Sequence, residues 1–253
     1  MNNDVQKASL LKRFSAFTFD LILLACLVVA LALGVSAVVG YDDYNAQMNA
    51  KYEAYGQQYG VDVNISLDAF NNLSEEELKQ YNAAVEAINK DEEATRLYSL
   101  IVNLTLVIAT VSILLAYVAL ELVVPLLFGN GQTLGKKIFG IALMRVDGVK
   151  VTPFMMFVRT ILGKFTVETM IPVLIVLMLL FGLIGSFGTM IIGLILLVQV
   201  ILLIATRTRS TIHDMMACTI AVDMASQRIF DSPEARTEYM KRISAEAAAK
   251  AEY

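Results

Sequence analysis

Two ionisable residues, Arg13 and Asp20, open the first long apolar stretch of the chain. At about 100° per residue, a spacing of seven returns to within roughly 20° of the same helix face, so both side chains share one stripe, about 10 Å apart along the axis. A carboxylate within a membrane-length apolar helix is costly, and it usually faces the protein interior or a water-filled path and has a partner. The spacing therefore predicts that Asp20 lies in a buried polar cluster with Arg13.

Other acidic side chains occur at comparable places further along the chain. Glu121 lies about 10 Å inside the end of the second apolar stretch if that stretch ends near Phe128. Asp214 follows the last apolar stretch and is adjacent to His213. One hypothesis is a proton or ion relay built from Asp20, Glu121 and Asp214, with Arg13 as their charge partner and with Gln199, His213 and Arg159 as neighbouring polar groups. The alternative for Glu121 is an interfacial side chain that reaches water.

The composition identifies the broad class of protein. Hydrophobic residues make up 57% of the 253 residues and charged residues 17%, and the mean hydropathy is +0.63. These values predict an integral membrane protein in contact with a lipid bilayer. The net charge of −4 argues against a nucleic-acid partner. Two cysteines and one histidine offer neither a disulfide framework nor a metal site, so we expect no metal and no cofactor.

The glycine-rich stretch after the second apolar run could be mistaken for a phosphate-binding loop. The spacing from Gly131 to Gly135 is one residue short of the Walker A pattern, and Lys137 stands where Ser or Thr is required. Nucleotide binding is therefore not expected here.

The apolar runs predict an all-α membrane protein with four transmembrane helices, a helical extracytoplasmic insert, and a small cytoplasmic β-hairpin or three-stranded sheet. Sixteen of the 20 Lys and Arg residues, Arg207 and Arg209 among them, lie outside the insert, so both termini are predicted to be cytoplasmic in a multi-pass protein of the cell membrane. The expected segments are 1–40, the cytoplasmic N-terminus and first transmembrane helix; 41–96, the acidic extracytoplasmic insert; 97–128, the second transmembrane helix; 129–168, a cytoplasmic hairpin and interfacial helix; 169–205, a transmembrane helical hairpin; and 206–253, a cytoplasmic C-terminal segment and tail.

The acidic insert contains two helical patterns. Ser74 and Glu77 form a capping-box signature, which predicts a helix from about Ser74 into the second transmembrane span. Asp42 to Gln58 is a weaker helical pattern, and Tyr55 to Asn72 is expected to be mostly loop.

On the cytoplasmic side, Asp147-Gly148 is a two-residue turn signal between Ile141–Val146 and Val149–Thr152. An isolated hairpin is marginal in water, so Thr219–Asp223 is predicted to add a third strand. Pro153 to Phe165 has the pattern of a short interfacial helix.

Several of these features occur together in one known family. They are Arg13 and Asp20, the Gly131–Lys136 turn, Asp147-Gly148, Arg159, and His213-Asp214 followed by Ala217-Cys218-Thr219. In these features the chain resembles the RDD family of bacterial integral membrane proteins over about Lys7–Val39 and Leu97–Val222. The resemblance implies that the arginine and the two aspartates of the family name are Arg13, Asp20 and Asp214. Cys218 stands where the family usually has glycine, and the insert and the tail from Asp231 lie outside the resemblance.

The resemblance leaves two hypotheses for function. Some members are linked to sodium/proton exchange, which favours a small transporter for monovalent cations and protons. The alternative is a non-transporting membrane scaffold in which Arg13 and Asp20 form a structural pair and the insert binds a partner. Four short spans enclose little volume, so a transporter is expected to be a homo-oligomer. No enzyme activity is expected, because His213 and Asp214 lack a nucleophile partner.

Overall fold

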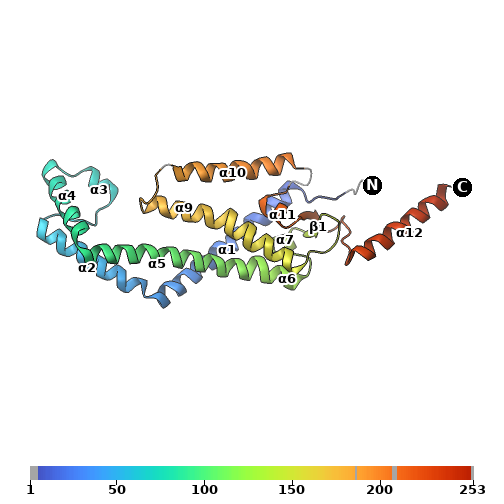
Figure 1. Ribbon diagram of the computed structural model, residues 1–253, viewed down its shortest axis with the longest axis horizontal. Coiled ribbons are helices and arrows are strands. Elements are labelled where there is room, and N and C mark those ends of the chain that lie inside the picture. The colour runs from blue at the N-terminus through green and yellow to red at the C-terminus, as the bar shows by residue number, and fades with distance from the viewer. Residues whose placement is uncertain (1–4, 186, 207–209, 252–253) are drawn as a thin grey trace. The chain divides into compact units, whose positions relative to one another are not determined.

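The computed structural model describes residues 5–185, 187–206 and 210–251, and these residues are mostly helical (Figure 1). Contacts divide the chain into two compact units. One unit comprises the residues up to Val29 and those from Ile113 onward, and the other comprises Ala30–Ser112. All the candidate polar residues named above belong to the first unit.

Three helices of the described residues are long and apolar enough to cross a membrane. They are α1 (Leu10–Val39), the continuous helix Glu92–Phe128 and the continuous helix Pro153–Leu180. A fourth helix, α10 (Phe187–Ala205), is apolar over a shorter stretch, Phe187–Leu202. Large apolar side chains such as Leu33 are exposed on these helices, as expected for surfaces in contact with lipid.

Two of these helices contain π-helical segments, in which hydrogen bonds run from residue i to i+5. The helix Glu92–Phe128 consists of α5 (Glu92–Tyr117), η1 (Val118–Val123) and α6 (Val124–Phe128). The helix Pro153–Leu180 consists of α8 (Pro153–Phe157), η2 (Val158–Met170) and α9 (Ile171–Leu180).

The predicted interfacial helix is longer than its sequence pattern indicates. It does not end near Phe165 but continues to Leu180, so no new span begins at Thr169. Pro172 does not interrupt it, because it lies in the first turn of α9, directly after the π-helical segment. The long apolar run does turn at the glycine cluster, where Gly182 has a φ of 66°.

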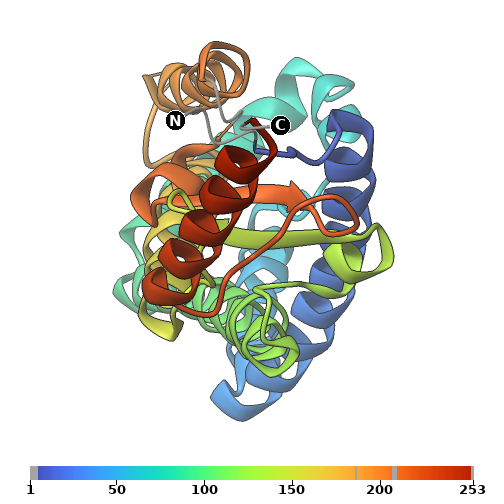
Figure 2. The ribbon, with the colours of Figure 1, turned by 90° about the vertical axis from the view of Figure 1, so that its right-hand side faces the viewer.

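A small antiparallel sheet pairs β1 (Ile141–Arg145) with β2 (Thr219–Asp223), and Figure 2 shows the two strands side by side. This long-range pairing confirms the sequence prediction. The predicted hairpin strand Val149–Thr152 does not form a strand of the sheet, because it makes only one isolated bridge to β1, between Met144 and Lys150. The Asp147-Gly148 turn does form, but the chain after it pairs with Phe230 instead.

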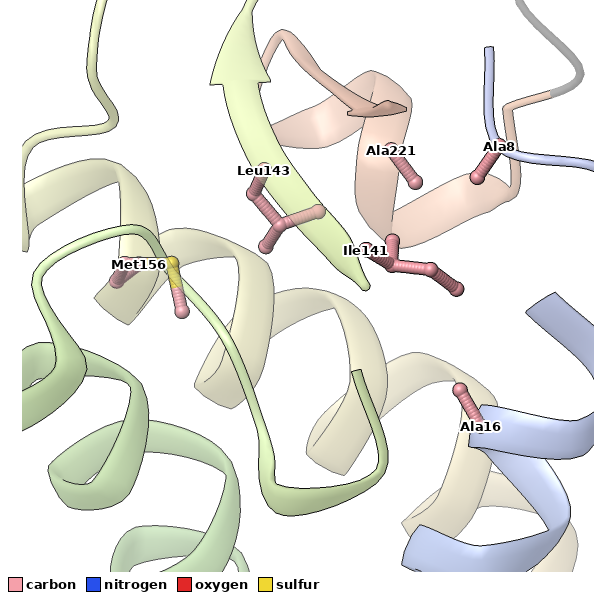
Figure 3. Packing of buried hydrophobic residues seen from close by; sticks show 6 residues of the cluster. All are labelled: Ala8, Ala16, Ile141, Leu143, Met156 and Ala221. Carbon is pink, nitrogen blue, oxygen red and sulfur yellow. The ribbon is translucent and has the colours of Figure 1, made fainter. Parts of the chain in front are cut away.

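The sheet has an apolar core on each face. Ile141 and Leu143 point to one face and Ala142 and Met144 to the other, as the alternation of a strand requires. Figure 3 shows the first core, which consists of Ala8, Ala16, Ile141, Leu143, Met156 and Ala221. It joins the sheet to α1 and α8, and so fixes the start of α1 against the sheet.

Short helices complete the first unit. They are α7 (Leu134–Ile138), α11 (Ile212–Met216) and the C-terminal α12 (Pro233–Ala251). The charged residues Arg207 and Arg209, which contribute to the predicted orientation, lie outside the described residues.

The second unit contains the acidic insert, which folds as α2 (Tyr41–Tyr59), α3 (Leu67–Asn71) and α4 (Glu75–Lys90). Ser74 makes the predicted capping box with Glu77. The helix does not run on into the membrane span, because Asp91 leaves the helical conformation and accepts hydrogen bonds from the Glu93 and Ala94 amides at the start of α5. The expected loop from Tyr55 is also shorter, since α2 reaches Tyr59 and α3 forms within it.

Candidate functional site

The carboxylate of Asp20 binds the turn that precedes α7. Oδ1 accepts a 2.7 Å hydrogen bond from the Gly135 amide, and Oδ2 accepts one from the Thr133 hydroxyl. A Cβ atom at Gly135 would lie 2.9 Å from Cγ and Oδ1 of Asp20, a separation that real Cβ atoms essentially never show. Only glycine lets this backbone approach the carboxylate so closely.

Lys136 directly follows Gly135 in the chain. Its side chain is buried, and Nζ lies 3.1 Å from the Thr133 hydroxyl oxygen. Burial lowers the pKa of Lys136 to about 8, although the charges of Glu121 and Asp20 act in the opposite direction. This lysine can therefore change its protonation state close to neutral pH.

Glu121 is buried in the π-helical segment η1. Its Oε2 lies 2.6 Å from Nζ of Lys164, and both side chains are nearly inaccessible to solvent. The Thr160 hydroxyl donates a 2.9 Å hydrogen bond to the backbone carbonyl of Glu121, which ties η1 to η2. Glu121 is thus an internal ion-pair partner and does not reach water, which rules out the interfacial alternative.

The π-helical geometry of η2 explains how several charged residues reach one face. In an α-helix, Arg159 and Lys164 would be about 140° apart around the axis. A π-helix has more residues per turn, so residues five apart lie only about 50° apart around the axis, on the same face of the helix. In η2 the residues Arg159, Lys164 and Glu168 therefore follow one stripe, and each pairs with an opposite or polar group.

Asp214 lies between two arginines. The Arg159 guanidinium donates through Nε at 3.0 Å and Nη2 at 2.8 Å to Oδ1, and Nη2 of Arg13 lies 3.7 Å from Oδ2. Burial alone would raise the pKa of Asp214, but Arg159, His213 and Arg13 together hold it well below its usual range. The ionised carboxylate of Asp214 therefore holds α11 against η2 and α1.

His213 links α11 to two apolar helices. Its Nδ1 lies 2.7 Å from Glu168 Oε2, and its backbone amide donates a 2.9 Å hydrogen bond to Oε1. Gln199 of α10 hydrogen-bonds Glu168 and also accepts from the Ile212 amide. Burial and the charge of Arg159 lower the pKa of His213, despite the neighbouring Asp214 and Glu168.

A close approach of two backbones makes this arrangement possible. A Cβ atom at Gly163 would lie 2.5 Å from Cβ and 2.7 Å from Cα of His213. The glycine lets η2 lie directly against α11, so that Arg159 and Glu168 can both reach that short helix.

The structure brings the sequence-derived candidates together in pairs that differ from the expected ones. Arg13 pairs with Asp214, whereas Asp20 binds the Thr133–Gly135 turn. The sequence reasoning did not include Thr133, Lys136, Lys164 or Glu168 among the site residues. Charged residues at 159, 164 and 168 between two apolar stretches were the available signal, but their spacing fits no single α-helical face.

Among the described residues, the acids and bases of this network are equal in number. The acids are Asp20, Glu121, Glu168 and Asp214, and the bases are Arg13, Lys136, Arg159 and Lys164; Glu121, Asp214, Lys136 and Arg159 are buried and the other four are partly buried. In the part of the chain that the structure describes, no group of three or more His, Cys, Asp or Glu side chains is arranged to hold a metal ion. The arrangement places acidic and basic side chains next to one another.

The model of one protein family, the RDD family, matches residues 7–218 of the chain. The chain belongs to the RDD family. The matched range includes the charged residues described above, the insert and strand β1, and it ends just before strand β2. No match was found among curated proteins or among solved structures. In this RDD protein the arginine and the two aspartates implied by the resemblance, Arg13, Asp20 and Asp214, all lie in one compact unit.

Proposed function

We propose that this RDD family membrane protein is a small transporter that exchanges a monovalent cation for protons. The observation that supports the proposal is a largely buried series of ionisable side chains, Asp20, Lys136, Glu121 and Lys164, in which the Thr133 hydroxyl links Asp20 to Lys136. Ionisable groups inside apolar helices are costly, and they commonly form ion or proton pathways. No enzymatic reaction is part of the proposal.

The proposed exchange centres on Lys136. The ammonium group of Lys136 contributes positive charge close to the Asp20 and Glu121 carboxylates. When Lys136 releases its proton, this charge is lost, and a monovalent cation can replace it beside the same carboxylates. Re-protonation of Lys136 then expels the cation. The cation and the proton on Lys136 compete to neutralise the same carboxylates, so binding of one is coupled to release of the other.

The proposal includes a topology. Four spans, α1, Glu92–Phe128, Pro153–Leu180 and α10, cross the cell membrane, with both termini cytoplasmic and the acidic insert outside. The distribution of Lys and Arg supports this orientation. Because four spans enclose little space, the working transporter is proposed to be a homo-oligomer. Labelling of an Asn64→Cys variant in a background without Cys26 and Cys218 tests the orientation, and exclusively cytoplasmic labelling would contradict it.

A scaffold function is the second candidate. The observation that favours it is that Asp20, Glu121, Glu168 and Asp214, the acids of the network in the described residues, already have hydrogen-bond or ion-pair partners. A fully paired network stabilises a single conformation. In this case the buried charges would hold the helices together, and the acidic insert would bind a partner outside the membrane.

Transport assays with purified protein in liposomes distinguish the two functions. A pH-sensitive dye reports proton movement after addition of sodium, potassium or lithium in turn. We expect cation-dependent dye recovery that Asp20→Asn abolishes while the variant remains folded. Asp68→Asn, which makes the same change at an exposed position of the insert, is the matched control. Absence of recovery in well-folded wild-type protein, or full activity of Asp20→Asn, would leave the scaffold function.

A further inference from the structure

A cleft beside strand β1 and helix α12 shares no residue with the network of charged side chains described above. It has a volume of about 230 Å³ and lies between the turn after β1, the segment Gln227–Phe230 and the first turns of α12. Its lining includes the side chains of Arg228, Arg236 and Tyr239. None of the residues that line it takes part in the network described above.

Two arginines give this cleft a positive charge. Cζ of Arg228 lies 4.2 Å from the ring centroid of Tyr239 and 5.6 Å from that of Phe230. Arg236 lies against Gly148, where a Cβ atom would be 3.6 Å from its Nε. The two aromatic rings contact each other, with centroids 5.3 Å apart, and both make cation–π contacts with the Arg228 side chain.

Asp147 and Asp231, which are adjacent to the lining residues Gly148 and Phe230, are engaged with other cations. Asp147 pairs with Arg145 at 2.6 Å, and Asp231 pairs with Lys150 at 2.5 Å. Over residues 5–185, 187–206 and 210–251, neither Arg228 nor Arg236 forms an ion pair with a carboxylate. Arginine presents a planar fork of donors that suits carboxylates and phosphates, so the two guanidinium groups are available to an anion from outside the chain.

Apart from Gln227, the remaining side chains of the lining are apolar or aromatic. Val5, Met144, Val146 and Met240 contribute to it, and Met144 is itself almost fully buried in the sheet. Pockets for drug-sized ligands usually have volumes of roughly 300–1,000 Å³. A cleft of about 230 Å³ therefore suits a smaller ligand that has an anionic end and a compact apolar part.

We propose that this cleft binds a small organic anion, namely a phosphate monoester that carries a compact apolar or aromatic group. Arg228 and Arg236 bind the phosphate, and the apolar lining contacts the rest of the ligand. The same chemistry can come from a soluble metabolite or from the headgroup region of a phosphatidic acid. The site does not depend on the proposed transport.

Binding is measured by calorimetry with full-length protein in phosphatidylcholine nanodiscs. The probes are phenyl phosphate, inorganic phosphate and phenol, which separate the anionic part from the apolar part. We expect phenyl phosphate to bind more tightly than either of the other two. Arg228→Gln and Arg236→Gln should each weaken its binding at least tenfold. Lys241→Gln, an exposed cation of the same helix that does not line the cleft, should leave binding unchanged.

Three outcomes would overturn the proposal: no binding of phenyl phosphate, equal binding of phenol, or equal weakening by Lys241→Gln. Both arginines lie at the surface of the cleft, and unchanged thermal unfolding of the unliganded variants verifies that they fold. Nanodiscs that contain phosphatidic acid show whether the natural ligand is a lipid headgroup or a soluble molecule. Loss of phenyl phosphate binding there indicates a lipid ligand, and retention indicates a soluble one.

Discussion

Lys164 and Glu121 form a buried ion pair, with 2.6 Å between Nζ and Oε2, that joins two π-helical segments of different membrane helices. A π-helical turn aligns residues five apart, so Arg159 and Lys164 can serve two different acids from one face. The pair therefore connects the region around Asp20 and Lys136 with the region around Asp214 and His213. This connection is the reason to treat the buried charges as one network.

Gly135→Ala should destabilise the protein, because the new Cβ would lie 2.9 Å from the Asp20 carboxylate. Overpacking of this kind typically costs about 1–3 kcal/mol. Gly34→Ala is the control, since a Cβ at Gly34 would meet nothing within 4 Å. Thermal unfolding in detergent measures both variants. Equal unfolding temperatures for Gly135→Ala and the wild type would contradict the close contact between α1 and the turn.

Asp214→Asn should be strongly destabilising, because it leaves Arg159 buried beside an uncharged group. Removal of one partner of a buried ion pair costs about 3–5 kcal/mol. Asp147→Asn, which removes an ion pair that is about one-third exposed, should change stability by less than about 1 kcal/mol. Equal effects of the two substitutions on denaturant unfolding would argue against the buried pair.

The low pKa of Asp214 also predicts an acid limit of stability. A carboxylate whose pKa is lower in the folded state stabilises the protein above its unfolded value of 3.8, and this stabilisation is lost as the pH falls toward the folded value. Wild-type protein should lose stability steeply below about pH 4. In Asp214→Asn, the free energy of unfolding should change less with pH in that range. An equally steep loss of stability in this variant would assign the acid limit to other groups.

His213 predicts a separate pH dependence. Burial lowers its pKa below 6.5, so the unfolded state binds the proton more readily than the folded state. Stability should therefore decrease as the pH is lowered from about 7 to about 5. In His213→Gln, the free energy of unfolding, measured with denaturant at each pH, should decrease less over this interval. A wild-type protein that becomes more stable over this interval would show that the contact with Glu168 outweighs burial.

The sequence predicted those parts of the structure that follow from local patterns. The apolar helices, the Ser74 capping box and the strand segments around Ile141–Arg145 and Thr219–Asp223 all have local signals of this kind. The need of Asp20 for a partner could also be inferred, because an isolated buried carboxylate is too costly.

The choice of partners could not be predicted from helical periodicity. In an α-helix, which has 3.6 residues per turn, Arg159 and Lys164 would lie on different faces. Only the π-helical geometry of η2 brings them to the same face. Likewise, the donors for Asp20 are a backbone amide and a hydroxyl over 100 residues away in the sequence. Such partners become visible only once Gly135 is placed against α1.

The most direct test of the proposed exchange is the dye assay on Glu121→Gln in liposomes, compared with wild type and with Glu76→Gln, an exposed acid of the insert. Glu121→Gln keeps the shape of the side chain and removes the carboxylate that faces Lys164 and Lys136. We predict that cation-dependent proton movement is lost in Glu121→Gln and retained in Glu76→Gln, with both proteins folded. Wild-type rates in a folded Glu121→Gln protein would contradict a transport function for the buried network.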